Sequence, residues 1–193
     1  MKKKIAALIP AAGKSERMGM QKALLTLNNG IGIAQHLIDR FNNFGCDPVV
    51  IVVNEQFDSP HVVVEKLVTV VNQELEKGRS WSIYLGLQKV PEETACFIQN
   101  TDNPFLEPGL LSELVAAVKP DGYAVPVFDM HGGHPLLLGS RMVDFIRRQQ
   151  DPFDFRQALQ QFKRFEVPWK DDRILLNLNT RRDFEDFISR YPE

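Results

Sequence analysis

The sequence predicts an α/β protein with a mostly parallel, doubly wound sheet. Short apolar runs rich in β-branched residues alternate along the chain with segments whose apolar residues recur at helical spacing. The run Pro48–Val53 is continuously apolar, as expected of a strand covered on both faces. The run Ile5–Ile9 ends in small residues and Gly13, which is typical of a strand that leads into a ligand-binding loop.

The first half of the chain predicts strands and helices in turn. Ile33, Leu37, Ile38 and Phe41 recur at helical spacing, and Gly45 is a typical helix stop. Residues 61–67 are compatible with either a strand or a short helix. The predicted elements are a strand over 5–9, a helix over 31–44, strands over 48–53 and 68–71, a helix over 78–90 and a strand over 95–98.

The second half continues the alternation. Pro108 stands at a tolerated N-terminal helix position, and the pair Gly132-Gly133 predicts a turn between two strands. Right-handed crossovers between parallel strands would bring the ligand-binding loops to their carboxyl ends. The predicted elements are a helix over 108–118, strands over 123–128 and 136–138, helices over 141–150 and 155–162, a strand over 164–169 and a helix over 181–190.

Size and composition favour one enzyme domain spanning residues 1–193. A hydrophobic content of 44% is enough to bury a substantial core, and a net charge of −2 argues against a general nucleic-acid binder. Cys46 and Cys96 lack metal or redox spacing, so we expect reduced core residues and a cytoplasmic protein. The basic start followed by Ile5–Ala12 imitates a secretory signal, but it is short and Pro10 interrupts it. We therefore expect neither a signal peptide nor a membrane span.

The loop after the first strand has the properties of an anion-binding site. Ala11, Ala12 and Gly13 let a ligand approach backbone N–H groups, and Arg17 and Lys22 add two cations. A P-loop is excluded because Leu8 stands where its leading glycine is required, and a dinucleotide-binding loop is excluded because Ser15 replaces its second glycine. The alternative is an ordinary strand-to-helix turn with surface cations.

The segment Ala11–Leu25 resembles the A-A-G-x-S-x-R-M-G-x-x-K-x-L-L signature of the MobA-like NTP transferase family, which includes molybdenum cofactor cytidylyltransferases and guanylyltransferases. The resemblance extends over most of the chain. It implies a Rossmann-like, three-layer α/β/α nucleotidyltransferase fold of the nucleotide-diphospho-sugar transferase type. It also implies that Arg17 and the backbone of Ala11–Ser15, Lys14 included, hold the β- and γ-phosphates, while Lys22 neutralises the α-phosphate.

A second motif, Phe97–Pro104, places Asp102 after a predicted strand. A carboxylate there is a suitable ligand for Mg²⁺ bound together with substrate phosphates. Relatives usually read D-Q-P or D-M-P at this point, so Asn103 is a departure; we expect Asn103 to contact the acceptor. The alternative for Asp102 is an aspartate that shapes the turn before Pro104.

Two further segments carry nucleotide and metal contacts by resemblance. Asn72–Leu87 is similar to the family's base-pocket segment and implies that Asn72, Gly78, Ser80 and Ser82 bind the nucleotide. An equally acceptable interpretation is that Ser80 or Ser82 is a plain helix N-cap. The segment Leu175–Asp183 resembles the family's closing motif, in which the residue before the threonine reaches the metal ion.

That residue here is Asn179, whose amide oxygen can bind Mg²⁺ without adding charge. Thr180 and Asp183 predict a capping box for the last helix. Arg181 and Arg182 replace the family's Pro-Glu pair and face either an anionic acceptor or solvent.

The pattern Gly133-His134-Pro135 resembles a motif of the cytidylyltransferase branch and favours CTP over GTP. We expect His134 to contact the acceptor; the alternative is a purely structural histidine. A zinc site is a poor interpretation of His131 and His134, because no further Cys, His or carboxylate ligand follows at an evident spacing.

The inferred function is nucleotidyl transfer from an NTP to a phosphorylated acceptor, with molybdopterin as the expected acceptor, Mg²⁺ as cofactor and a molybdoenzyme or chaperone as protein partner. Catalysis would rest on alignment and charge neutralisation, since an ionised phosphate needs no base. Two alternatives remain open. One is a transferase for another small phosphorylated acceptor, such as a sugar or alcohol phosphate. The other is a catalytically weakened nucleotide-binding regulator.

Overall fold

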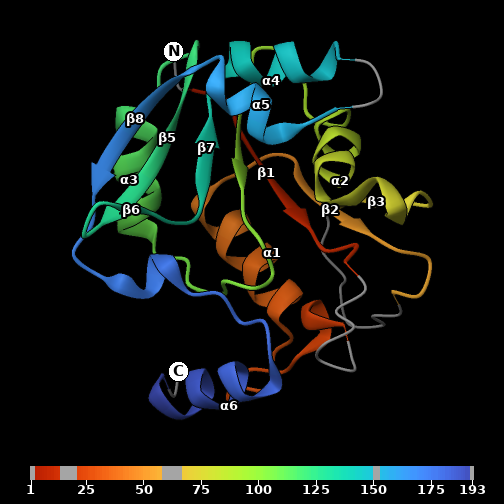
Figure 1. The fold of residues 1–193 in the computed structure, drawn as a ribbon, viewed down its shortest axis with the longest axis vertical. Helices are drawn as coiled ribbons and strands as arrows, with labels where there is room; N and C mark the ends of the chain where they lie inside the picture. Colours follow the sequence, from red (N-terminus) through yellow and green to blue (C-terminus); the bar gives the residue numbers. More distant parts are fainter. Residues whose placement is uncertain (1–2, 14–20, 58–66, 150–152, 192–193) are drawn as a thin grey trace.

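The computed structural model describes residues 3–13, 21–57, 67–149 and 153–191. In these residues eight strands form one sheet in the order β3-β2-β1-β4-β7-β5-β6, with β8 paired to β5 (Figure 1). Their bounds are Ile5–Pro10 (β1), Val49–Val53 (β2), Leu67–Val71 (β3), Ala95–Ile98 (β4), Gly122–Phe128 (β5), His131–Gly132 (β6), Leu136–Leu138 (β7) and Lys163–Pro168 (β8).

The sheet is mixed but mostly parallel, as predicted. β1 runs parallel to β2 and β4, β2 to β3, and β5 to β8. β7 is antiparallel to β4 and β5, and β6 is antiparallel to β5. Because β1, β2, β3 and β4 point the same way, the loops that follow them meet at one edge of the sheet.

Helices cover both faces of the sheet, which gives three layers. Alternate residues of each central strand point to opposite faces, so Ala7 and Ile9 pack against one helical layer and Ala6 and Leu8 against the other. The first layer contains Ile33–Phe44 (α1) and Pro108–Ala117 (α3), and the second contains Gly78–Leu87 (α2), Ser140–Arg147 (α4) and Phe155–Gln160 (α5).

The C-terminal helix Arg181–Arg190 (α6) packs beside the segment that precedes α1, where Asn28 Nδ2 donates to the carbonyl of Ile188 (Figure 1). Its N-terminus has the predicted capping box between Thr180 and Asp183. The preceding 3-10 helix, Asp172–Leu175, lies against β5 and β6. The end of the chain therefore returns to the edge of the sheet where the loops gather.

The predicted fold class is confirmed, and each predicted strand and helix is present with small shifts at its ends. Gly45 ends α1 in the left-handed conformation, and Pro108 starts α3. The ambiguous segment 61–67 lies outside the described residues except for its last residue, which begins β3. Cys46 and Cys96 are free and buried, and burial raises the pKa of Cys46 to about 12.

The predicted Gly-Gly turn is wrong. The chain reverses at Asp129 and Met130, both with positive φ, as a two-residue hairpin turn requires, and Gly132 belongs to β6. Gly133 follows β6, and a larger residue does not fit there because a Cβ would lie 2.4 Å from the Ile174 carbonyl oxygen. Gly133 thus allows close backbone packing, whereas a Cβ at Gly132 would meet the side chains of Arg164 (3.0 Å) and Val125 (3.2 Å).

None of the helices within the described ranges is long and apolar enough to cross a membrane.

Candidate functional site

A cavity of about 800 Å³ opens where β1, β3 and β4 end. It gathers most of the predicted site residues, although they are far apart in the sequence. Lys14, Ser15 and Arg17 lie outside the described residues. The predicted residues that line the cavity are Ala11, Ala12, Gly13, Lys22, Asn72, Gly78, Ser82, Asp102 and Asn179.

The floor of the cavity is the backbone that follows β1. Ala11 N–H donates to the Val52 carbonyl at 2.7 Å, and the Ala12 carbonyl accepts from Asn54 Nδ2 at 3.2 Å. These bonds hold the strand end against β2 and its loop. The small side chains of Ala11 and Ala12 leave the main chain close to the cavity, where an anionic ligand can reach it.

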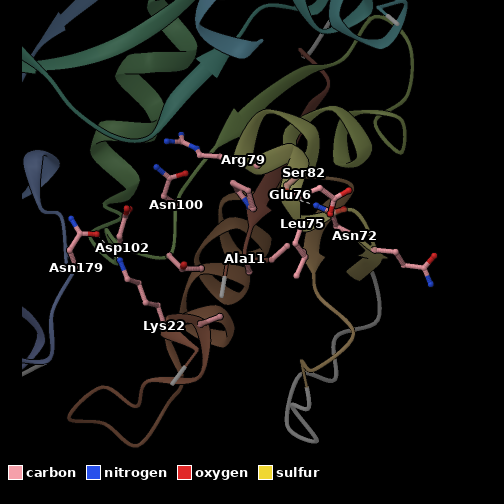
Figure 2. A pocket seen from close by; sticks show the side chains of 17 residues that line it. Ala11, Lys22, Asn72, Leu75, Glu76, Arg79, Ser82, Asn100, Asp102 and Asn179 are labelled. Atoms are coloured by element: carbon pink, nitrogen blue, oxygen red, sulfur yellow. Dashed lines mark hydrogen bonds between the residues drawn. The ribbon is translucent and has the colours of Figure 1, made fainter. Parts of the chain in front are cut away.

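A cationic and an acidic group meet on one side of the cavity (Figure 2). Lys22 Nζ donates to Asn179 Oδ1 at 2.8 Å, and Leu178 N–H donates to the Asp102 carbonyl at 2.8 Å. The second bond holds Asn179 next to Asp102. Burial raises the pKa of Asp102, and the charges of Lys22 and Arg79 oppose that rise.

The other side of the cavity is formed by Asn72 and the start of α2 (Figure 2). Asn72 Nδ2 donates to Ser82 Oγ at 3.0 Å, and Asn72 Oδ1 accepts from Glu74 N–H at 2.9 Å. Gly78 has a φ of +73°, which an L side chain rarely adopts. The bend at Gly78 and the paired Asn72 amide therefore shape this side of the cavity and present polar groups to it.

Ser80 and Ser82, which the sequence could not separate, have different surroundings. Ser82 lines the cavity, whereas Ser80 Oγ accepts from Phe155 N–H at 3.2 Å and faces a neighbouring cavity. The N-cap interpretation is wrong for both, since α2 has Lys77 at its N-cap and no side-chain cap.

Arg79 is a cavity residue that the sequence analysis missed. Its guanidinium extends toward the side where Asn100 lies (Figure 2). Desolvation by the surrounding protein lowers its pKa, while Asp102 opposes that change and Arg156 adds to it. Its position directly after Gly78, at the start of a helix, was the available signal, because a helix N-terminus favours anions.

Asn103, which we expected to contact the acceptor, does not line the cavity and is fully buried. Its Nδ2 donates to the carbonyls of Arg173 (3.1 Å) and Ile174 (2.9 Å), and its Oδ1 accepts from Phe105 N–H at 3.0 Å. The side chain thus ties the loop that carries Asp102 to the segment that leads to Asn179.

We expect Asn103→Ala to lower the free energy of unfolding by about 2–3 kcal/mol, because it leaves buried backbone groups without their partner. Urea unfolding measures this loss. Asn177→Ala, an exposed change in the same returning segment, is the control and should stay within about 0.5 kcal/mol of the wild type. An unchanged stability together with a raised acceptor KM would restore the acceptor-binding role of Asn103.

His134 also lies outside the main cavity and lines the neighbouring one. Its Nε2 is 3.2 Å from Nδ2 of Asn100, which lines the main cavity. Burial, followed by the charge of Arg79, lowers the pKa of His134 to about 4. The neutral ring can therefore accept a hydrogen bond at physiological pH.

Within the described ranges, no group of three or more His, Cys, Asp or Glu residues is placed to hold a metal ion. Asp102 and Asn179 supply one carboxylate and one amide oxygen to the same cavity. Such a pair can bind Mg²⁺ only together with ligand oxygens and water.

The chain matches the model of a protein family described as "MobA-like NTP transferase domain" over residues 7–165. It is 26% identical to the molybdenum cofactor cytidylyltransferase of Escherichia coli over 192 residues, which is 98% of each chain. It is 28% identical to a probable molybdenum cofactor guanylyltransferase of Natranaerobius thermophilus, covering 94% of this chain and 93% of the relative.

Two further similarities extend the comparison. A 2-C-methyl-D-erythritol 4-phosphate cytidylyltransferase of Bacillus cytotoxicus is 30% identical over 131 residues, which cover 63% of this chain and 58% of the relative. The crystal structure of Rv0371c from Mycobacterium tuberculosis superposes with a TM-score of 0.83 at 17% identity, covering 98% of this chain and 99% of that one. The structural likeness extends over nearly the whole chain.

Proposed function

Since the chain belongs to the MobA-like NTP transferase family, a family of nucleotidyltransferases, we propose that it transfers CMP from CTP to the phosphate of molybdopterin. In this reaction an acceptor phosphate oxygen bonds to the α-phosphorus of CTP. The bond from that phosphorus to the β-phosphate oxygen breaks, and pyrophosphate leaves with the electron pair. The acceptor oxygen is already ionised at neutral pH, so alignment and charge balance are the main requirements.

The observation that carries the proposal is the convergence of Lys22, Asp102 and Asn179 on one cavity at the carboxyl ends of parallel strands. The backbone of Ala12 and Gly13 would receive the β- and γ-phosphates. Arg17, which lies outside the described residues, is proposed for the same phosphates because of its place in the signature. Lys22 would leave the Asn179 amide oxygen and bind the α-phosphate.

Asn72, Gly78 and Ser82 are proposed to bind the base and ribose. The Asn72–Ser82 hydrogen bond supports this role, since it fixes polar groups at the recess before a ligand arrives. CTP is favoured over GTP by the Gly133-His134-Pro135 pattern, whereas the two relatives that match almost the whole chain are one cytidylyltransferase and one probable guanylyltransferase.

Asp102 and Asn179 fit a Mg²⁺ ion, because a carboxylate and an amide oxygen are both hard oxygen ligands and the Asn179 oxygen already accepts from an ammonium group. A bound Mg²⁺ ion supplies positive charge to the triphosphate oxygens. Asp102 and Asn179 would hold it, and the Leu178–Asp102 backbone bond would keep the two side chains together.

Pyrophosphate release measured with each of the four NTPs and a panel of acceptors tests the proposal. We expect release with CTP and molybdopterin in the presence of Mg²⁺. Release with GTP and molybdopterin would correct the base, and release only with sugar or alcohol phosphates would remove the molybdopterin assignment.

A second candidate is cytidylyl transfer to an alcohol phosphate. The partial match to an erythritol-phosphate cytidylyltransferase favours it, but that match covers less of this chain than the molybdenum cofactor enzymes do. A weakened, regulatory nucleotide binder is a third candidate, suggested by the uncharged Asn179 and its bond to Lys22. Calorimetry with CTP and Mg²⁺ identifies it through tight binding without turnover on any acceptor.

The neutral state proposed for His134 predicts a pH dependence of stability. Its pKa is about 4 in the folded protein against an ordinary value of 6.5. The unfolded chain therefore binds a proton more readily between these values, and stability is lost as the pH falls from 6.5 to 4. Urea unfolding across this range should show a smaller loss in His134→Gln. An identical slope in both proteins would contradict the assignment.

A further inference from the structure

A second cavity of about 610 Å³ adjoins the first on the face of the sheet that α2 and α5 cover. Tyr123 and Val125 of β5 and Leu136 of β7 form an apolar floor, and Leu159 of α5 lies beside it. Arg79 lines both cavities. A ligand bound in the second cavity can therefore extend past Arg79 into the first.

Three guanidinium groups border this second cavity, from Arg79, Arg156 and Arg164. The one carboxylate among its described lining residues, Asp154, accepts from the N–H groups of Arg156 (2.7 Å) and Gln157 (3.3 Å) at the start of α5. Arg164 forms an exposed ion pair with Glu166 at 3.1 Å. The balance of charge around the cavity is positive.

Arg79 lies between the two cavities, since it lines both of them. Desolvation lowers its pKa; Asp102, which lines the first cavity, opposes that change, and Arg156, which lines the second, adds to it. A bound anion on the side of Arg156 would offset the repulsion between the two cations, as Asp102 does from the other side. Arg79 is therefore the group that can bind a phosphate at the boundary between the cavities.

Neutral polar groups continue across the same boundary. Asn100 lines the first cavity, His134 lines the second, and their side chains lie 3.2 Å apart. A ligand that crosses the boundary would meet charged donors at Arg79 and uncharged groups beside it. This arrangement suits a molecule with one phosphate end and one neutral, flat body.

We propose that the second cavity holds the body of the acceptor, and that Arg79 binds the acceptor phosphate at the boundary while Arg156 and Arg164 bind oxygen atoms of a flat polar ring. This inference rests on the proposed function and assigns the acceptor side of the same reaction. The cavity volume is in the range of small-molecule sites, and an apolar floor with guanidinium groups at its rim can pack against a ring and bind its carbonyl oxygens.

Direct binding tests the assignment without turnover. The probe is a fluorescent pterin that carries a phosphomonoester, measured by anisotropy with saturating CTP and no Mg²⁺. We expect the double variant Arg156→Gln/Arg164→Gln to bind the probe at least about tenfold more weakly with CTP affinity unchanged, because the variant loses two charge-assisted contacts to the ring. Arg79→Gln should also bind the probe more weakly than the wild type does. Arg141→Gln, an exposed change at the start of α4, is the control and should bind like the wild type.

Equal probe affinity in the wild type and the double variant would overturn the inference, as would a wild type that does not bind the probe. The proposed function fails separately. If the variants bind the probe as expected but the protein releases no pyrophosphate, the cavity assignment stands and the proposed transfer reaction is wrong. Pyrophosphate release with an acceptor KM that the double variant leaves unchanged keeps the reaction and removes the cavity assignment.

Discussion

Lys22→Ala should reduce the kcat for pyrophosphate release about 30- to 1,000-fold while changing CTP affinity far less. The expected loss of about 2–4 kcal/mol is that of one charged donor acting on charge that develops in the transition state. Lys22 is placed for this role, since its ammonium group lies in the cavity against Asn179 and its charge acts on Asp102.

Lys89→Ala is the matched control. Lys89 is exposed and lies beyond the C-terminal end of α2, so this substitution removes the same charge away from the cavity. Single-turnover rates and calorimetric CTP affinity measured on both variants separate catalysis from binding. Lys22→Arg should recover little activity, since a planar guanidinium does not replace a compact point charge. A Lys22→Ala enzyme that retains a third of the wild-type kcat would contradict the proposed role.

The parallel core of this fold is readable from the sequence because its strands are covered on both faces. Val49–Val53 is fully buried and consists of Val and Ile alone, so pattern and structure agree. Helix ends that depend on one or two neighbouring residues could also be predicted from the sequence, as Gly45 and the Thr180–Asp183 capping box show. The turn at Asp129 and Met130 was missed because, although aspartate tolerates a positive φ, methionine rarely adopts one, and the neighbouring Gly132-Gly133 pair gave the stronger turn signal.

Some residues of the candidate site could likewise be predicted from the sequence, and others could not. The family signature and strand ends indicated Lys22 and Asp102, and the cavity brings both together. Local pattern could not show that Asn103 faces inward, since its partners, the carbonyls of Arg173 and Ile174, are about seventy residues away. The sequence analysis missed Arg79 for a related reason, because the position of Arg79 between two cavities depends on how α2 packs on the sheet.

Asp102→Asn should lower the rate of nucleotidyl transfer at a fixed Mg²⁺ concentration by at least about 100-fold. The carboxylate is the only charge that the proposed pair offers to the metal, and its removal costs several kcal/mol of charge stabilisation. Calorimetric titration of the CTP-bound protein with Mg²⁺ should show the matching loss of affinity. Asp121→Asn, an exposed change of the same type, is the control.

The same substitution should leave the free energy of unfolding unchanged or slightly increased. Burial raises the pKa of Asp102, which means that folding disfavours its ionised form, and a neutral amide of the same shape does not carry that penalty. Asn179→Asp should act in the opposite direction on the metal, since a second carboxylate lowers the Mg²⁺ concentration needed for half-maximal binding. If Asp102→Asn binds Mg²⁺ as the wild type does, the metal is held elsewhere; if it unfolds instead, Asp102 has a structural role that its environment does not indicate.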